Sequence, residues 1–407
     1  MIDLETVNKL LNENNLKRDT YKLIVNMDSI KDLGIKHGNI LNRTSLINML
    51  RTLKEKYHVP ERTSISLLGH YLQNVLQLFT EIEIYSEKKG EKVTRYISTY
   101  TEVSPYEIAL SLLSNSFLSH YSALYVHDLT INNPKDIYIN REQSKKPVNK
   151  DNAKLTQRKV DYAFSKEMRR TTDIYNFVYQ GTHYTVHVLN TKHTNKTGII
   201  REKPVGFSKP IQVTNLERTL LDATIRPRYS GGSLEVLEAY HTAKPVISLQ
   251  KVADYLKKFD YIYPYEKSIL FYLQNSNYSK NEIAIFKDIL DRSPNKSINF
   301  YLDYQLTQKR EDKQIGIFYP SAIDDIKIEY FDIDSAYIKI RKNDELALYE
   351  IKSIHLYNKD GEEKVVIKSF SHVEIYDNYQ EIVFDISKKY HVSKEKITIA
   401  EINDGKG

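Results

Sequence analysis

Between residues 44 and 97 the spacing of apolar residues changes from helical to alternating, which restricts the folds open to this segment. Thr44 or Ser45 can begin a helix, and Pro60 ends the pattern because the residue before a proline avoids the helical conformation. Thr63 or Ser64 can begin a second helix. The apolar residues of the first predicted helix are Leu46, Met49, Leu50, Leu53 and Tyr57, and those of the second are Ile65, Leu68, Leu72, Val75, Leu76 and Phe79.

Two short segments of alternating apolar and polar residues follow, at 81–85 and 93–97. The residues between them, 87–92, include three lysines and a glycine, which predicts a β-hairpin with a basic tip. Helix, break, helix and hairpin, in that order, are typical of a winged helix-turn-helix. In that fold the second helix enters the DNA major groove and the hairpin contacts the DNA backbone.

The solvent face of the second predicted helix carries hydrogen-bonding side chains that suit base edges, namely Ser66, His70, Gln73, Asn74 and Gln77. Basic residues at the start of the first helix and in the hairpin are predicted to contact phosphates, namely Arg43, Lys88, Lys89 and Lys92. Phosphate contacts position a protein on DNA but do not read sequence. The alternative is a winged helix that binds protein, because a polar outer face is normal on any helix.

The net charge of +6 is small for 407 residues, but its distribution is uneven. Between Arg141 and Lys209 there are 15 Lys or Arg residues against 6 Asp or Glu residues, so this segment alone carries +9. A clustered basic segment suggests a polyanionic partner. The alternative is a solvated surface, with a flexible loop over 145–154.

Composition excludes several kinds of site. The chain has no Cys, which rules out disulfides and Cys-ligated metals. We also expect no metal at His183, His187 and His193, because no carboxylate is clustered with them in the sequence. No apolar run approaches the ~20 residues that span a membrane, and the acidic N-terminus lacks the apolar region of a signal peptide. We therefore predict a cytoplasmic protein without a membrane partner.

The stretch from Val213 to Tyr240 combines a helix, a break and a second helix. Residues 214–217 fit the T-x-x-E capping box, and Pro227 ends the first helix. Gly231 and Gly232 permit a turn with positive φ before the second helix. This turn could bind an anion, but no Gly-Lys-Ser/Thr follows it. The favoured interpretation is therefore structural, with Glu217 in the capping box and Arg218 pairing with Asp222 or Glu235.

These patterns predict an α+β protein with three parts: an N-terminal extension and winged helix-turn-helix over 1–100, a central α/β domain over 101–320, and a small antiparallel β-rich module over 321–407. The helices expected after the hairpin span 106–113, 117–124, 252–259, 265–275 and 282–290. The expected strands span 136–140, 173–179, 183–189, 315–319, 326–330, 336–340, 346–351 and 365–368.

From about residue 40 to 320 the chain resembles the AbiEi family of type IV antitoxins. The resemblance rests on the order and spacing of five segments, 104–110 (SPYEIAL), 120–129 (HYSALYVHDL), 213–240, 263–265 (YPY) and 269–273. The first forty residues and the tail from about Ser321 have no counterpart in it.

The resemblance implies a bacterial transcriptional repressor whose winged helix binds repeats in the double-stranded DNA of its own promoter. It implies that the central domain is antitoxin-like and adds basic surface, and that the chain is not an enzyme and needs no cofactor. The toxin implied is a nucleotidyltransferase encoded next door, and its neutralisation does not require a stable complex. The implied role of the locus is phage defence by abortive infection.

The tail allows two other hypotheses. Nucleases of the PD-(D/E)XK type hold Mg²⁺ with an Asp and a Glu on adjacent strands, and a Lys two residues after the Glu helps activate water. Asp332 or Asp334, with Glu350 and Lys352, have these types in this order. Alternatively, the tail recruits another protein by presenting a sheet edge, as in a non-enzymatic defence adaptor.

Overall fold

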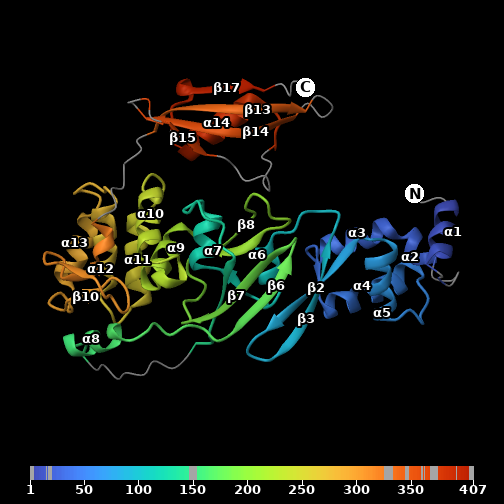
Figure 1. The fold of residues 1–407 in the computed structure, drawn as a ribbon, viewed down its shortest axis with the longest axis horizontal. Coiled ribbons are helices and arrows are strands. Elements are labelled where there is room, and N and C mark those ends of the chain that lie inside the picture. The colour runs from blue at the N-terminus through green and yellow to red at the C-terminus, as the bar shows by residue number, and fades with distance from the viewer. Residues whose placement is uncertain are drawn as a thin grey trace. The chain divides into compact units, whose positions relative to one another are not determined.

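The computed structural model describes residues 4–14, 16, 21–145, 154–324, 333–343, 348–358, 361, 363–366, 375–390 and 392–402. It contains both helices and a large mixed sheet, which confirms the predicted α+β class (Figure 1). The chain divides into two compact units. The first comprises Met1–Ala243 and Ile247–Ile323, and the second comprises Lys244–Val246 and Asp324–Gly407.

A nine-stranded sheet with the order β1-β3-β2-β6-β7-β5-β4-β9-β8 runs through the first unit. Its strands are β1 (Ile40–Leu41), β2 (Phe79–Ser86), β3 (Glu91–Ser98), β4 (Phe117–Leu118), β5 (Asp136–Glu142), β6 (Ile174–Tyr179), β7 (Thr182–Thr191), β8 (Ile199–Glu202) and β9 (Ile211–Thr214). The strands β2 and β6 pair at Tyr85 with Asn176 and at Ser86 with Tyr175. Residues on both sides of position 100 therefore contribute strands to one sheet.

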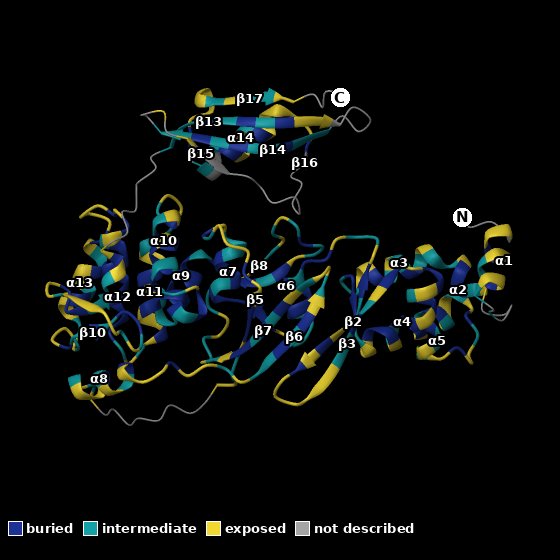
Figure 2. Ribbon diagram, in the orientation of Figure 1, coloured by how far each residue is buried: buried dark blue, intermediate teal, exposed yellow. Residues whose placement is uncertain are grey.

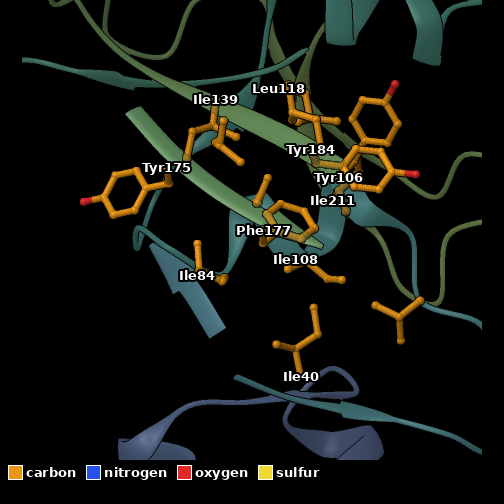
Figure 3. Packing of buried hydrophobic residues seen from close by; sticks show 14 of the residues in the cluster. Ile40, Ile84, Tyr106, Ile108, Leu118, Ile139, Tyr175, Phe177, Tyr184 and Ile211 are labelled. Atoms are coloured by element: carbon orange, nitrogen blue, oxygen red, sulfur yellow. The ribbon is translucent and has the colours of Figure 1, made fainter. Parts of the chain in front are cut away.

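The central strands bury alternate side chains in a shared hydrophobic core (Figure 3). Ile139 on β5, Phe177 on β6 and Val186 on β7 are all buried in it. Ile84 from the hairpin and Ile108 from the following helix are buried in the same core. This continuity follows from the period-2 pattern of strands, which places alternate residues on one face.

Some helices of the first unit precede the strands of the sheet in the sequence, some lie between these strands, and some follow them (Figure 1). They are α1 (Leu4–Glu13), α2 (Tyr21–Val25), α3 (Met27–Lys36), α4 (Arg43–Tyr57), α5 (Ile65–His70), the π-helical segment η2 (Tyr71–Val75), α6 (Pro105–Leu110), α7 (His120–Val126), α8 (Gln157–Ser165), α9 (Leu216–Ile225), the 3-10 turn η3 (Pro227–Tyr229), α10 (Ser233–Ala243), α11 (Leu249–Phe259), α12 (Tyr265–Asn275) and α13 (Ala284–Arg292). A small sheet of β10 (Phe300–Tyr301), β12 (Ile317–Pro320) and β11 (Lys309–Asp312) follows, and then the 3-10 turn η4 (Ser321–Ile323).

Most elements predicted for the centre of the chain are confirmed, with two corrections. The expected helix over 117–124 is wrong at its start, because residues 117 and 118 form β4 and the helix begins at His120. The expected helix over 106–113 ends at Leu110. The Ser111 hydroxyl donates to the Ile108 carbonyl at 2.6 Å, and such local side-chain bonds compete with continued helix.

In the described residues of the second unit, a sheet packs against one helix. Its elements are β13 (Ile333–Asn343), β14 (Leu348–Asn358), β15 (Glu363–Val366), β16 (Ile375–Tyr376), α14 (Tyr379–Tyr390), the 3-10 turn η5 (Lys394–Lys396) and β17 (Ile397–Glu401). Ile338, Ile354, Ile382 and Ile386 form part of its core. The predicted strand over 326–330 lies outside the described residues. The expectation of a purely antiparallel module is wrong, because β17 pairs with β13 in parallel after a helical crossover.

Candidate nucleic-acid interface

The first helix of the candidate interface, α4, is fixed at its start by a capping box. The Asn42 side chain accepts from the Ser45 amide at 2.9 Å, and the Ser45 hydroxyl accepts from the Asn42 amide at 2.6 Å. The helix therefore begins at Arg43, with Asn42 as its cap, and not at the predicted Thr44 or Ser45. Its predicted residues Leu46, Met49, Leu50 and Leu53 are buried, whereas Arg43 in the first turn is exposed.

The second helix begins at the predicted cap, since the Ser64 hydroxyl accepts from the Leu67 amide at 3.1 Å. It changes from α-helix to the π-helical segment η2 at Tyr71. The sequence predicted no such change. Single π turns within helices occur frequently at functional sites, and this one contains Gln73 and Asn74, two of the residues predicted to contact bases.

Four of the five residues chosen for base contact lie on α5 and η2, whereas Gln77 lies in the turn beyond η2 and not on the helix as predicted. Ser66, His70 and Asn74 are exposed, and Gln73 is half-buried. The Asn74 amide nitrogen lies 3.0 Å from Nδ1 of His70, so the two side chains orient each other. On the opposite side, the predicted apolar residues Leu68, Leu72, Val75 and Leu76 are buried (Figure 2).

A tight turn connects this helix to the hairpin. Gln77 is exposed and has a φ of 51°, a left-handed conformation that reverses the chain. Its carbonyl accepts from the Thr99 hydroxyl at 2.6 Å. The polar helix face and the base of the hairpin are thereby joined through one hydrogen bond.

The hairpin forms as predicted, with β2 and β3 slightly longer than expected. Lys88 and Lys89 lie exposed at its tip, where Gly90 has a φ of 66°. Lys92 is exposed as well, but its ammonium lies 2.6 Å from the Glu83 carboxylate, which offsets its charge. Of the four cations assigned to phosphate contact, Lys88, Lys89 and Arg43 remain the stronger candidates.

The tip of the hairpin is also attached to the central sheet. The Glu87 amide donates to the Ile174 carbonyl at 3.0 Å, and the Glu87 carboxylate accepts from the Asn176 side chain at 2.7 Å. These contacts hold the base of the Lys88–Lys89 turn, so the two lysines are presented from a fixed position.

The motif around α9 is structural in its contacts. The capping box predicted at Thr214 is wrong: Asn215 caps the helix, and the Thr214 hydroxyl lies 2.7 Å from the Thr219 hydroxyl. Glu217 instead forms an ion pair of 3.1 Å with Lys251. Gly231 and Gly232 have φ values of 83° and 99°, which the predicted turn requires.

Arg218 pairs with Asp222 at 2.8 Å and not with Glu235. Both side chains are buried, and Arg218 also donates to the Thr197 carbonyl at 3.0 Å. Burial raises the pKa of Asp222, and the adjacent guanidinium opposes that rise. A Cβ on Gly198, whose φ is 72°, would lie 2.8 Å from the Arg218 Cβ, so glycine is required for this close approach.

Two carboxylates of the nuclease hypothesis, those of Asp334 and Glu350, are not brought together. Asp332 lies outside the described residues. Asp334 contacts Lys396 at 2.5 Å, whereas Glu350 contacts Lys352 at 2.7 Å. Glu350 pairs with Arg341, seven residues from Asp334 along β13, which separates the two carboxylates by roughly 23 Å at ~3.3 Å per residue.

Among the described residues, no group of three or more His, Asp or Glu side chains could hold a metal ion. His187 contacts Asp136 at 2.7 Å, and His193 lies 3.5 Å from Glu142. No helix in the described part of the chain is long and apolar enough to cross a membrane.

No protein-family model and no curated protein sequence matches this chain. Among solved structures, the chain is similar to the RV2827C protein from Mycobacterium tuberculosis, with a TM-score of 0.44 and 10% sequence identity. That similarity covers 72% of this chain and 89% of the other. It is too weak to transfer a fold assignment or a function.

Proposed function

We propose that this protein is a DNA-binding transcriptional autorepressor of the AbiEi type, acting as the antitoxin of a bacterial toxin–antitoxin locus. One observation carries the proposal. The helix formed by α5 and η2 exposes Ser66, His70 and Asn74 while it buries Leu68 and Leu72, and an exposed lysine pair follows on the hairpin.

In this proposal the unit is a winged helix-turn-helix, and the α5–η2 helix enters the major groove. An Asn or Gln amide can bind adenine with two hydrogen bonds. The Asn74 amide nitrogen has two hydrogens, so its contact with His70 leaves one hydrogen and the side-chain oxygen for a base. Gln77, at the end of the helix, offers a second amide of the same chemistry.

Lys88 and Lys89 would contact phosphates beside the groove. Because each phosphate contact releases counterions, it contributes about 0.9 to the slope of log affinity against log salt. The exposed position of both lysines, on a turn whose base is tied to β6, supports this role.

The test is binding to duplex DNA from the region upstream of the gene, measured by fluorescence anisotropy at several salt concentrations. The double substitution Lys88→Glu and Lys89→Glu should weaken binding at least about tenfold and reduce the salt slope by about 2. The matched control is Lys257→Glu with Lys258→Glu, which places the same charge change on exposed residues of α11. Equal loss in both double variants, or no upstream binding by the wild type in low salt, would contradict the proposal.

The antitoxin role has its own test. Co-expression with the adjacent nucleotidyltransferase should restore growth, and Lys88→Glu with Lys89→Glu should retain that rescue if repression and neutralisation use different surfaces. The absence of an adjacent nucleotidyltransferase gene would remove the antitoxin part and leave the DNA-binding part standing.

A further inference from the structure

The helix α8 is fixed to the rest of the first unit by the side chains of one face. The Gln157 side chain donates to the Asn299 carbonyl at 2.9 Å and accepts from the Asn299 amide at 2.8 Å. Asp161 accepts from the Tyr301 hydroxyl at 2.9 Å. Phe164 stacks on Tyr301 with ring centroids 5.7 Å apart. The acidic residue of this helix therefore lies on the inward face, and its basic residues lie on the outward face.

The outward face of α8 carries exposed cations beside an aromatic ring, and Figure 2 shows exposed residues along this helix. Arg158, Lys159 and Tyr162 are exposed, as is Lys166 directly after the helix. Arg158 and Lys159 precede Tyr162 by four and three residues, which places both beside it on the helix. Tyr162 is 64% exposed, which is unusual for a side chain with so large an apolar surface.

Lys166 holds the Tyr162 ring in place. Its ammonium lies 3.8 Å from the ring centroid and also donates to the phenolic oxygen. This cation lowers the pKa of Tyr162. Glu167 follows and is exposed too, but Arg169 and Arg170, two and three residues after it, are also exposed and keep this stretch basic.

We infer that this face of α8 binds unpaired nucleotides, with a base stacked on the free face of Tyr162 and the flanking phosphates held by Arg158, Lys159 and Lys166. Aromatic rings next to cations are the usual means of binding single-stranded nucleic acid, because every base has a face that can stack. Duplex DNA offers phosphates to this face but no unstacked base, so an exposed ring would gain little from it. The site shares no residue with the candidate duplex interface.

The first experiment compares single strands with a duplex. Fluorescein-labelled poly(U) and poly(dT) of about 20 nucleotides, and a duplex of the same length, are titrated with the full-length protein. Tyr162→Ala should weaken binding of the single strands about tenfold, because the stacking contact is lost. Tyr162→Phe should retain it. The control Tyr379→Ala removes another exposed tyrosine, 40% exposed on α14, and should change nothing.

The second experiment observes the stacking directly. The chain has no tryptophan, so Tyr162→Trp introduces a single tryptophan whose emission a stacked base quenches. We expect saturable quenching by poly(U) or poly(dT), weaker quenching by the duplex, and none in Tyr379→Trp. Comparison of the two polymers shows whether the ligand is RNA, DNA or either.

Two variants separate this inference from the proposed repressor function. Lys88→Glu with Lys89→Glu should lose duplex binding and keep single-strand binding, whereas Tyr162→Ala should do the reverse. Equal single-strand affinity of Tyr162→Ala and the wild type would overturn the inference. Absence of quenching in Tyr162→Trp at saturating polymer would also overturn it, whatever happens to duplex binding.

Discussion

At the scale of single residues, the sequence did not predict the best-defined polar contacts of the central region. His120 is buried, has a φ of 52°, and its Nδ1 lies 2.9 Å from the Ser119 hydroxyl. Glu142 accepts from the Lys196 amide at 3.2 Å, 54 residues away in sequence. The Glu142 contact joins residues so distant in sequence that it leaves no local spacing signal, so it could not be predicted, whereas the polar face of α5 could.

The position of His120 predicts a specific pH dependence. Burial, together with Arg226 and Arg218, lowers its pKa from 6.5 to about 3. The folded state therefore binds this proton more weakly than the unfolded state, and acid favours unfolding. The free energy of unfolding should fall by up to roughly 1.4 kcal/mol per pH unit as pH decreases from 6.5 towards 3.

Urea unfolding at pH 6.5 and at about pH 5 measures this effect. His120→Asn removes the titration while keeping a residue type that tolerates positive φ, so its stability should vary less between the two pH values. The control His58→Asn changes an exposed histidine with a φ of 54° and should keep the wild-type dependence. Identical pH profiles for all three proteins would refute the assignment.

At the scale of elements, periodicity predicted which face of each helix is buried better than where each helix begins. Leu46, Met49 and Leu53 are buried as expected, yet α4 starts at Arg43 because Asn42 and not Thr44 provides the cap. The same error occurred at α9, where Asn215 replaced Thr214. Asn, Ser and Thr cap helices almost equally well, so adjacent candidates cannot be ranked from sequence.

The contribution of the Asn42 cap to stability can be tested by substitutions at the cap and inside α4. Asn42→Ala removes a hydrogen bond to the Ser45 amide and should lower the free energy of unfolding by about 1 kcal/mol, measured by urea titration. Asn48→Ala makes the same chemical change inside α4, where alanine is the better helix former, and should not destabilise. Equal losses in the two variants would show that the cap contributes nothing beyond side-chain removal.

At the scale of the whole molecule, the sequence predicted the α+β class and a change of character near residue 321. It did not predict that the hairpin and the central strands form one sheet, because strand order depends on long-range pairing such as Tyr85 with Asn176. It also missed the parallel β17, which returns beside β13 after α14. Local sequence patterns carry little information on the order of strands in a sheet or on the parallel pairing of a distant strand.

The division into two units predicts two unfolding transitions in calorimetry. Ile338 and Leu53 are each fully buried, in separate hydrophobic clusters of the second and first units. Ile338→Ala and Leu53→Ala should each cost about 2–5 kcal/mol and lower the temperature of a different transition. A single transition that shifts equally in both variants would show that the units unfold together.

The pairing of β2 with β6 also limits how this protein can be recombined. An exchange of the first hundred residues for those of another protein would remove the strand that covers β6 and leave a row of unpaired backbone groups on an open edge. Such edges promote aggregation. The N-terminal segment therefore cannot be exchanged as a unit for that of another protein. Under the proposed function, a change of DNA specificity would be made through side chains on α5 and the hairpin, while the junction between β2 and β6 stays intact.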